Sequence, residues 1–154
     1  MNDNNKKFTI LMAEDDMDDY HLMKDAISEI KADVDIQLVQ DGGELIDYLL
    51  CQGNFQKKED VPRPDIILLD LNMPKVDGRE ALITIKSFPD LKFIPVIVFT
   101  TSRETKDICQ CYISGANSYI SKPKSFNDLL EIVNNLIKYW LHTVTLPNQE
   151  ACLK

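Results

Sequence analysis

Hydrophobic and polar positions alternate in blocks along this chain, with short apolar runs separated by stretches in which apolar residues recur every three or four positions. A short run of aliphatic and aromatic residues predicts a buried strand, whereas the three-to-four spacing predicts a helix with one buried face. We therefore expect strands at residues 8–13, 35–39, 65–69, 93–99 and 118–120. The expected helices cover residues 17–30, 41–50, 79–88, 103–115 and 126–140.

Residues typical of helix ends support these boundaries. Asp16 and Ser125 precede two of the predicted helices, and the D-x-x-E sequence that begins at Asp41 has the form of a capping box. Gly115 is a suitable end for the fourth helix. The last helix has the clearest apolar stripe, which consists of Phe126, Leu130, Val133, Ile137 and Trp140.

Regular alternation of strands and helices predicts an α/β fold. Parallel strands joined by right-handed helical crossovers form a sheet that is covered on both faces, which explains why several runs are apolar throughout. The expectation is one domain of 154 residues, built as a three-layer, doubly wound (βα)5 sandwich. Two stretches lie outside the alternation, a polar loop at 51–64 and a tail at 141–154.

Charge and composition exclude some functions. A formal net charge of -8 disfavours binding to nucleic acid, because it repels a phosphate backbone and no stripe of Lys and Arg reverses it locally. The N-terminus is polar and no apolar run approaches membrane-spanning length, so we expect a soluble, cytoplasmic protein without a membrane partner. The four cysteines lack metal-finger spacing and are expected to be reduced thiols.

Polar side chains follow four of the five predicted strands. Open α/β sheets bind ligands at the carboxyl ends of their strands, so these side chains are expected to share one edge of the sheet. They are Glu14, Asp15 and Asp16 after the first strand, Asp70 after the third, Thr100 and Thr101 after the fourth, and Lys122 after the fifth. Of these, Asp16 is better explained as a helix cap.

This set of side chains suits phosphoryl chemistry. Several carboxylates close together repel one another unless they share a cation, and hard oxygen ligands suit Mg²⁺. With Mg²⁺ and Lys122 offsetting the charge, the Asp70 carboxylate is a candidate nucleophile toward phosphorus. The Thr100 hydroxyl and the Lys122 ammonium are then candidates to bind phosphoryl oxygens.

Four motifs together resemble one known family. "AEDD", "LLDLNMPKVDG", "VFTTS" and "SYISKP" are similar to the receiver domain of two-component response regulators, and the resemblance covers residues 7–140. It implies the flavodoxin-like receiver fold with strand order 2-1-3-4-5. Residues 1–6 are then a flexible N-terminus.

The resemblance also implies roles for single residues. Asp70 is the expected phosphoacceptor, Asp15 a direct metal ligand, and Glu14 a ligand through water. Asn72 is expected to offer its backbone carbonyl to the metal. Pro74 and Gly78 match the turn after the active strand.

Other matching positions belong to the switch. Thr100 is expected to follow the phosphoryl group on activation and Tyr119 to change rotamer with it. Lys122 is expected to pair with the phosphoryl group, and Pro123 to follow it through a cis bond. Thr101 occupies a position that is Ala or Gly in many receivers, so we expect it to hinder water and slow self-hydrolysis.

The long loop and the tail indicate a particular subgroup of this family. Together they are similar to the single-domain regulators that partner bacterial phytochrome histidine kinases. The implied function is a stand-alone response regulator that takes a phosphoryl group from a sensor histidine kinase and has no enzymatic activity beyond self-phosphotransfer and self-dephosphorylation. Output through the face of the fourth helix, fifth strand and fifth helix is expected, as is a homodimer in which the tail takes part.

Two other functions remain as alternatives. A haloacid-dehalogenase-like phosphohydrolase would also use an Asp nucleophile, but it needs a second Asp where this chain has Asn72. A phosphorylation-independent receiver-like interaction module is the other alternative. Such a module would be expected to lack the acids or the lysine that this chain retains.

Overall fold

A five-stranded parallel sheet forms the centre of the computed structural model, which describes residues 7–57 and 61–152. The predicted flexible N-terminus, residues 1–6, lies outside the described residues. The strands are β1 Phe8–Ala13, β2 Val34–Val39, β3 Ile66–Leu69, β4 Val96–Thr100 and β5 Ser118–Ser121. Their spatial order is β2-β1-β3-β4-β5 and each neighbouring pair is parallel, which confirms the predicted fold class and strand order.

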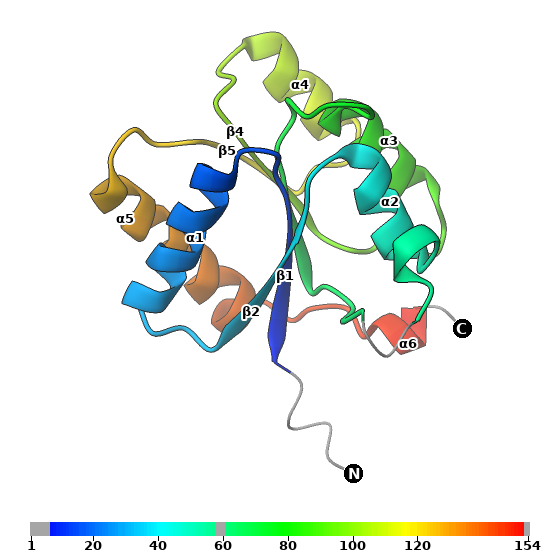
Figure 1. Ribbon diagram of the computed structural model, residues 1–154, viewed down its shortest axis with the longest axis horizontal. Helices are drawn as coiled ribbons and strands as arrows, with labels where there is room; N and C mark the ends of the chain where they lie inside the picture. The colour runs from blue at the N-terminus through cyan, green and yellow to red at the C-terminus, as the bar shows by residue number, and fades with distance from the viewer. Residues whose placement is uncertain (1–6, 58–60, 153–154) are drawn as a thin grey trace.

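Helices cover both faces of this sheet. They are α1 Met17–Glu29, α2 Gly42–Leu50, α3 Gly78–Ser87, α4 Thr105–Ile113 and α5 Phe126–Ile137. Figure 1 shows α1 and α5 on one side of the sheet and α2 and α3 on the other. Three predicted caps are confirmed, because the side chains of Asp16, Asp41 and Ser125 accept hydrogen bonds from backbone N–H groups in the first turns of α1, α2 and α5.

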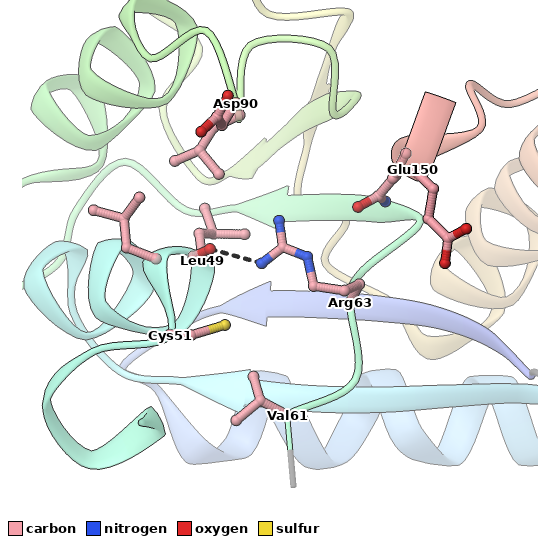
Figure 2. A pocket seen from close by; sticks show the side chains of 9 residues that line it. Leu49, Cys51, Val61, Arg63, Asp90 and Glu150 are labelled. Atoms are coloured by element: carbon pink, nitrogen blue, oxygen red, sulfur yellow. Dashed lines mark hydrogen bonds between the residues drawn. The ribbon is translucent and has the colours of Figure 1, made fainter. Parts of the chain in front are cut away.

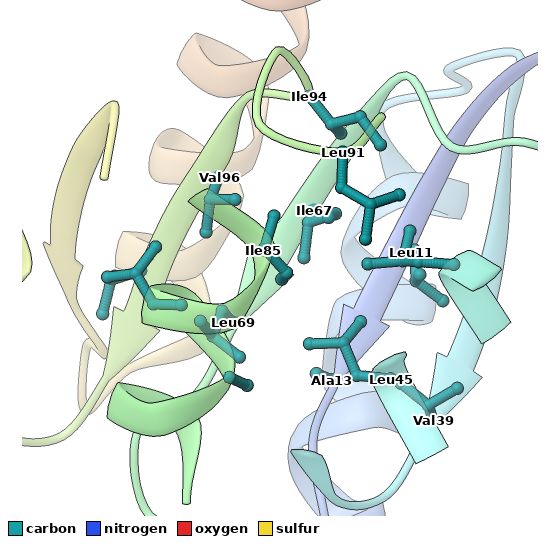
Figure 3. Close-up of a cluster of buried hydrophobic side chains, with 14 of the residues drawn as sticks. Leu11, Ala13, Val39, Leu45, Ile67, Leu69, Ile85, Leu91, Ile94 and Val96 are labelled. Carbon is teal, nitrogen blue, oxygen red and sulfur yellow. The ribbon is translucent and has the colours of Figure 1, made fainter. Parts of the chain in front are cut away.

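Two apolar clusters hold the three layers together. Along β1, Leu11 and Ala13 point into the cluster under α2, α3 and α4, and Ile10 and Met12 point into the cluster under α1 and α5. Figure 3 shows part of the first cluster, in which Leu11 of β1 and Leu45 of α2 lie on the same side of the sheet as Ile67 of β3 and Val96 of β4. Each fully buried aliphatic side chain stabilises the fold by about 1.5–3 kcal/mol.

Two sequence-based details differ from the structure. The fourth strand begins at Val96 and not at residue 93, because Pro95 has no N–H to donate and contributes only its carbonyl, which accepts from Ile67 N at 2.9 Å. In α5 the buried residues are Leu129, Val133, Leu136 and Ile137. Of the predicted stripe, Val133 and Ile137 are therefore buried. Phe126 is 38% exposed, and Leu130 and Trp140 are only partly buried against the core.

The long loop and the tail lie side by side near the start of β3, at the end of the sheet opposite Asp70, which follows the end of that strand. The loop contains a 3₁₀ helix, η2 Gly53–Phe55, and α5 continues into a π-helix, η4 Lys138–Thr143, past the expected helix end at residue 140. The tail then forms α6 Gln149–Cys152, and Gln149 Nε2 donates to Pro64 O at 2.6 Å.

A pocket of about 370 Å³ lies where the loop, α2 and α6 meet. In Figure 2 the Arg63 side chain reaches toward α2, where its guanidinium donates to Leu49 O at 2.6 Å, and Glu150 of α6 lies across from it. All four cysteines are free. None of the helices in the described part of the chain has the length and apolar character needed to cross a membrane.

Candidate functional site

The site begins at the carboxyl end of β1. Glu14 N donates to Val39 O at 2.9 Å, which continues the β1–β2 pairing by one residue and turns the Glu14 side chain inward. Glu14 is only 1% exposed, whereas Asp15 beside it is exposed. The two acids that follow β1 are therefore held at different depths.

Asp70 is fixed by backbone contacts on both sides. Its N–H donates to Ala13 O at 3.1 Å, so it lies beside the acids of β1, and its residue is 6% exposed. The turn after β3 folds back until Gly78 N donates to Leu71 O at 2.9 Å. A Cβ at Gly78 would be 2.1 Å from Asp70 O, so this close approach requires glycine.

The ends of β4 and β5 supply a hydroxyl and an ammonium. Lys122 N donates to Thr100 O at 2.7 Å, which places both residues at the same level of the sheet. Thr100 is fully buried, and its hydroxyl has no hydrogen-bond partner among the described residues. A buried hydroxyl without a partner is costly, so it is suited to bind an incoming group.

Lys122 Nζ lies among three carboxylates. It is 2.6 Å from Glu14 Oε1, 2.7 Å from Asp19 Oδ2 and 3.2 Å from Asp70 Oδ2. Burial alone would lower the pKa of Lys122, but the hydrogen bonds with Asp19 and Glu14 raise it above its usual value, so the group is an ammonium at neutral pH. Burial raises the pKa of Glu14, and the nearby Asp70 charge adds to the rise, while the Lys122 hydrogen bond opposes it.

Three of the acids form a candidate metal centre. Glu14, Asp15 and Asp70 each offer a carboxylate oxygen, and these atoms lie within 4.8 Å of one another. Charged oxygen donors are the ligands preferred by hard divalent cations. One ammonium does not neutralise the whole group of acids, so the donor set fits a divalent metal.

The remaining predicted residues are chain neighbours of these groups or contact the loop beside them. Asn72 N donates weakly to Asp70 Oδ1 at 3.4 Å, and Thr101 is exposed at the start of the β4–α4 loop. Tyr119 OH donates to Ser102 O in that loop at 2.9 Å, so the tyrosine contacts the segment that follows Thr100. The bond before Pro123 is trans, so the cis bond suggested by the resemblance is wrong here. The trans form is also the one that an isolated X–Pro bond favours, by about 0.5–1 kcal/mol.

Comparison with known proteins identifies the family. The model of the response regulator receiver domain matches residues 10–134 of this chain. This chain belongs to the response regulator receiver family. Receivers of two-component systems are signalling proteins. The chain is 40% identical to response regulator Rcp1 of Synechocystis sp. over 145 residues, and this alignment covers 94% of this chain and 97% of Rcp1.

Solved structures of receivers agree with the fold. The phosphorylated cyanobacterial phytochrome response regulator RcpA superposes with a TM-score of 0.85 at 40% identity. The superposition covers 93% of this chain and 100% of RcpA. The Mn²⁺-bound form of Rcp1 superposes with a TM-score of 0.82 at 41% identity and covers 92% of this chain and 99% of that one. A divalent metal in that receiver accords with the acidic centre found in this one.

The structure adds residues that sequence reasoning missed. Asp19 contacts Lys122 although it was not predicted to belong to the site. One signal was available, because Asp19 lies one helical turn before the buried Met23 and so places a charge on the inward stripe of α1. The Arg79 guanidinium in α3 pairs with Asp107 in α4 at 2.8 Å, and that pair had no sequence signal because the two residues are far apart in the chain.

Proposed function

We propose that this receiver accepts a phosphoryl group on Asp70 from a sensor histidine kinase. The observation that carries the proposal is the convergence of Asp70 with a buried ammonium, Lys122, and with the buried Thr100 hydroxyl, which has no hydrogen-bond partner in the described part of the chain. In the transfer, an Asp70 carboxylate oxygen forms a bond to phosphorus while the bond from phosphorus to the histidine nitrogen breaks. Lys122 and Thr100 are placed to bind phosphoryl oxygens as the charge moves onto this side.

The proposed metal is Mg²⁺. Asp15 and Asp70 would hold it directly, Glu14 through water, and Asn72 through its backbone carbonyl. When bound, Mg²⁺ offsets the negative charge of the carboxylates and of the incoming phosphoryl group. The clustered oxygens of Glu14, Asp15 and Asp70 support this assignment.

The same geometry suggests how the signal leaves the site. Thr100 would turn its hydroxyl toward the phosphoryl group, and Tyr119 would give up its hydrogen bond to Ser102 O and turn inward. The α4–β5–α5 face would change as a result.

Thr101 would set the lifetime of the phosphorylated state. Its exposed side chain directly follows Thr100, where it would hinder water from approaching the phosphoryl group. We expect the Thr101→Ala variant to lose its phosphoryl group faster than the wild type. Intact-mass measurements after removal of the phosphoryl donor give both rates, and equal rates would contradict this role.

The proposed kinase is of the bacterial phytochrome type, and the proposed location is cytoplasmic. RcpA and a response regulator in red light signalling of R. palustris, both similar to this chain, support the choice of kinase. We also propose a homodimer in solution. This chain covers 97% of Rcp1 and 100% of RcpA, so the similarity extends over nearly the whole of those regulators, and this supports the finer assignments.

Phosphotransfer from a purified kinase tests the proposal. A radiolabelled, autophosphorylated phytochrome histidine kinase is mixed with the wild type or with Asp70→Asn, and the label is followed by gel electrophoresis. We expect rapid transfer to the wild type in the presence of Mg²⁺ and none to the variant. A non-phytochrome kinase that transfers equally fast would remove the phytochrome assignment, and label on Asp70→Asn would contradict Asp70 as the acceptor.

A further inference from the structure

Asp19 differs from the other two partners of Lys122 in where it comes from. It lies in the first turn of α1, whereas Glu14 and Asp70 follow β1 and β3 at the edge of the sheet. The Asp19 side chain is 29% exposed and still approaches Lys122 Nζ to 2.7 Å. This ion pair therefore ties the β5–α5 loop to α1 across the site.

Two of the three carboxylates that contact Lys122 belong to the candidate metal centre, and the third does not. Glu14 and Asp70 share the clustered oxygens with Asp15, but Asp19 is outside that cluster. On the proposed function, a cation would compete with Lys122 for the oxygens of Glu14 and Asp70, and the phosphoryl group would become bonded to Asp70. Among the present partners of Lys122, Asp19 is then the one that remains to hold the ammonium.

We propose that Asp19 is a positioning residue, which holds Lys122 Nζ over the phosphoacceptor before and during phosphoryl transfer. A lysine has a flexible four-carbon stem and its head must be fixed by its partners. Asp19 supplies a charge-assisted hydrogen bond from a rigid helix, so the ammonium is in place when the phosphoryl group arrives.

The chain provides a matched control one residue away. Asp18 lies in the same turn of α1, is exposed, and forms no ion pair among the described residues. Asp18→Asn and Asp19→Asn therefore make the same change in net charge at the same helix end. Only Asp19→Asn removes the carboxylate that contacts Lys122.

Two measurements test the proposal. The first is the rate at which acetyl phosphate adds a phosphoryl group in saturating Mg²⁺, followed by intact mass. We expect Asp19→Asn to slow this step about tenfold, as loss of one charge-assisted hydrogen bond implies, and Asp18→Asn to change it less than about twofold. Asp19→Glu, which keeps the carboxylate, is expected to recover part of the rate.

The second measurement does not depend on phosphorylation. Lysine-reactive ester labelling, read at Lys122 by peptide mass spectrometry, reports how well the ammonium is held. We expect Asp19→Asn to label Lys122 several-fold faster than the wild type and Asp18→Asn to label it at the wild-type rate. Equal labelling of Lys122 in both variants would overturn the proposal, as would equal phosphorylation rates. A wild type without any phosphoryl adduct would contradict the proposed function instead, and the labelling result would still decide whether Asp19 holds Lys122.

Discussion

At the residue scale, the placement of Asp70 depends on the missing side chain of Gly78. Any Cβ at residue 78 would meet Asp70 O at 2.1 Å and Leu71 Cα at 2.7 Å. We expect Gly78→Ala to force the backbone of Asp70 to shift and to cost about 1–3 kcal/mol or more in the free energy of unfolding. Urea unfolding gives the cost, and phosphorylation by acetyl phosphate is expected to fall with it.

Gly43→Ala is the control for that substitution. A Cβ at Gly43 would meet two side-chain atoms, Asp41 Oδ1 at 3.2 Å and Val76 Cγ2 at 3.8 Å, and no backbone atom outside its own helix within 4 Å among the described residues. Alanine is also the better helix former. We therefore expect a nearly neutral effect on stability. Equal losses of unfolding free energy in the two variants would show that the cost of Gly78→Ala does not come from the close contact with Asp70.

At the element scale, an ion pair joins α3 to α4 near the site. Arg79 in α3 donates to both oxygens of Asp107 in α4, each at 2.8 Å, and Ser102 Oγ donates to Asp107 Oδ2 at 2.6 Å. The β4–α4 loop, which also holds Tyr119 through Ser102 O, is thereby tied to α3. The position of this loop therefore depends on both helices.

This link predicts a pH dependence of stability. The hydrogen bond from Arg79, together with that from Ser102, lowers the pKa of Asp107 from 3.8 to about 2. A carboxyl whose pKa is lower in the folded state than in the unfolded state stabilises the fold fully at a pH above its unfolded-state pKa. This contribution is lost as the pH falls through its folded-state pKa. The shift corresponds to no more than about 2 kcal/mol, and solvent screening reduces it.

Asp107→Asn tests this link. Urea unfolding at pH 7 is expected to show a loss of about 1–2 kcal/mol relative to the wild type, and the difference is expected to shrink from pH 4 toward pH 2. Glu104→Gln removes a charge at the N-terminus of the same helix without a side-chain capping bond to lose. A similar loss in both variants would mean that the helix dipole, and not the Arg79 pair, is responsible.

Much of the element pattern was readable from the sequence. The bounds of β1 match the prediction, and the caps at Asp16, Asp41 and Ser125 were each recognisable because capping is a local interaction. The start of β4 was misplaced because apolar character continues through Pro95 while strand pairing does not. Phe126 was misassigned because periodicity says which side of a helix is apolar and not how far the sheet extends beneath it.

At the scale of the whole molecule, topology explains why the site could be predicted. Four motifs at strand ends become neighbours once the strands are parallel and in the order β2-β1-β3-β4-β5. The order itself came from family resemblance. Pairs such as Asp19 with Lys122 and Arg79 with Asp107 depend on where each helix lies across the sheet, and single-chain spacing does not specify that placement.

The tail is the second whole-molecule feature. Leu141 and Leu146 pack against the α1–α5 side of the core, and Gln149 bonds to Pro64 of the long loop. We expect truncation after Trp140 to lower the average mass measured by light scattering, because we propose that the tail takes part in the dimer. Gln149→Ala, which removes only the bond to Pro64, serves as the control. An unchanged oligomeric state after truncation would count against the tail.

Phosphorylation of the isolated protein shows whether Asp70 is a metal-dependent phosphoacceptor. The protein is incubated with acetyl phosphate, with and without Mg²⁺, beside Asp70→Asn, and intact masses are compared. We expect a single phosphoryl adduct that requires Mg²⁺ and is missing from the variant. Absence of the adduct in folded wild-type protein, or its presence on Asp70→Asn, would show that Asp70 is not the phosphoacceptor.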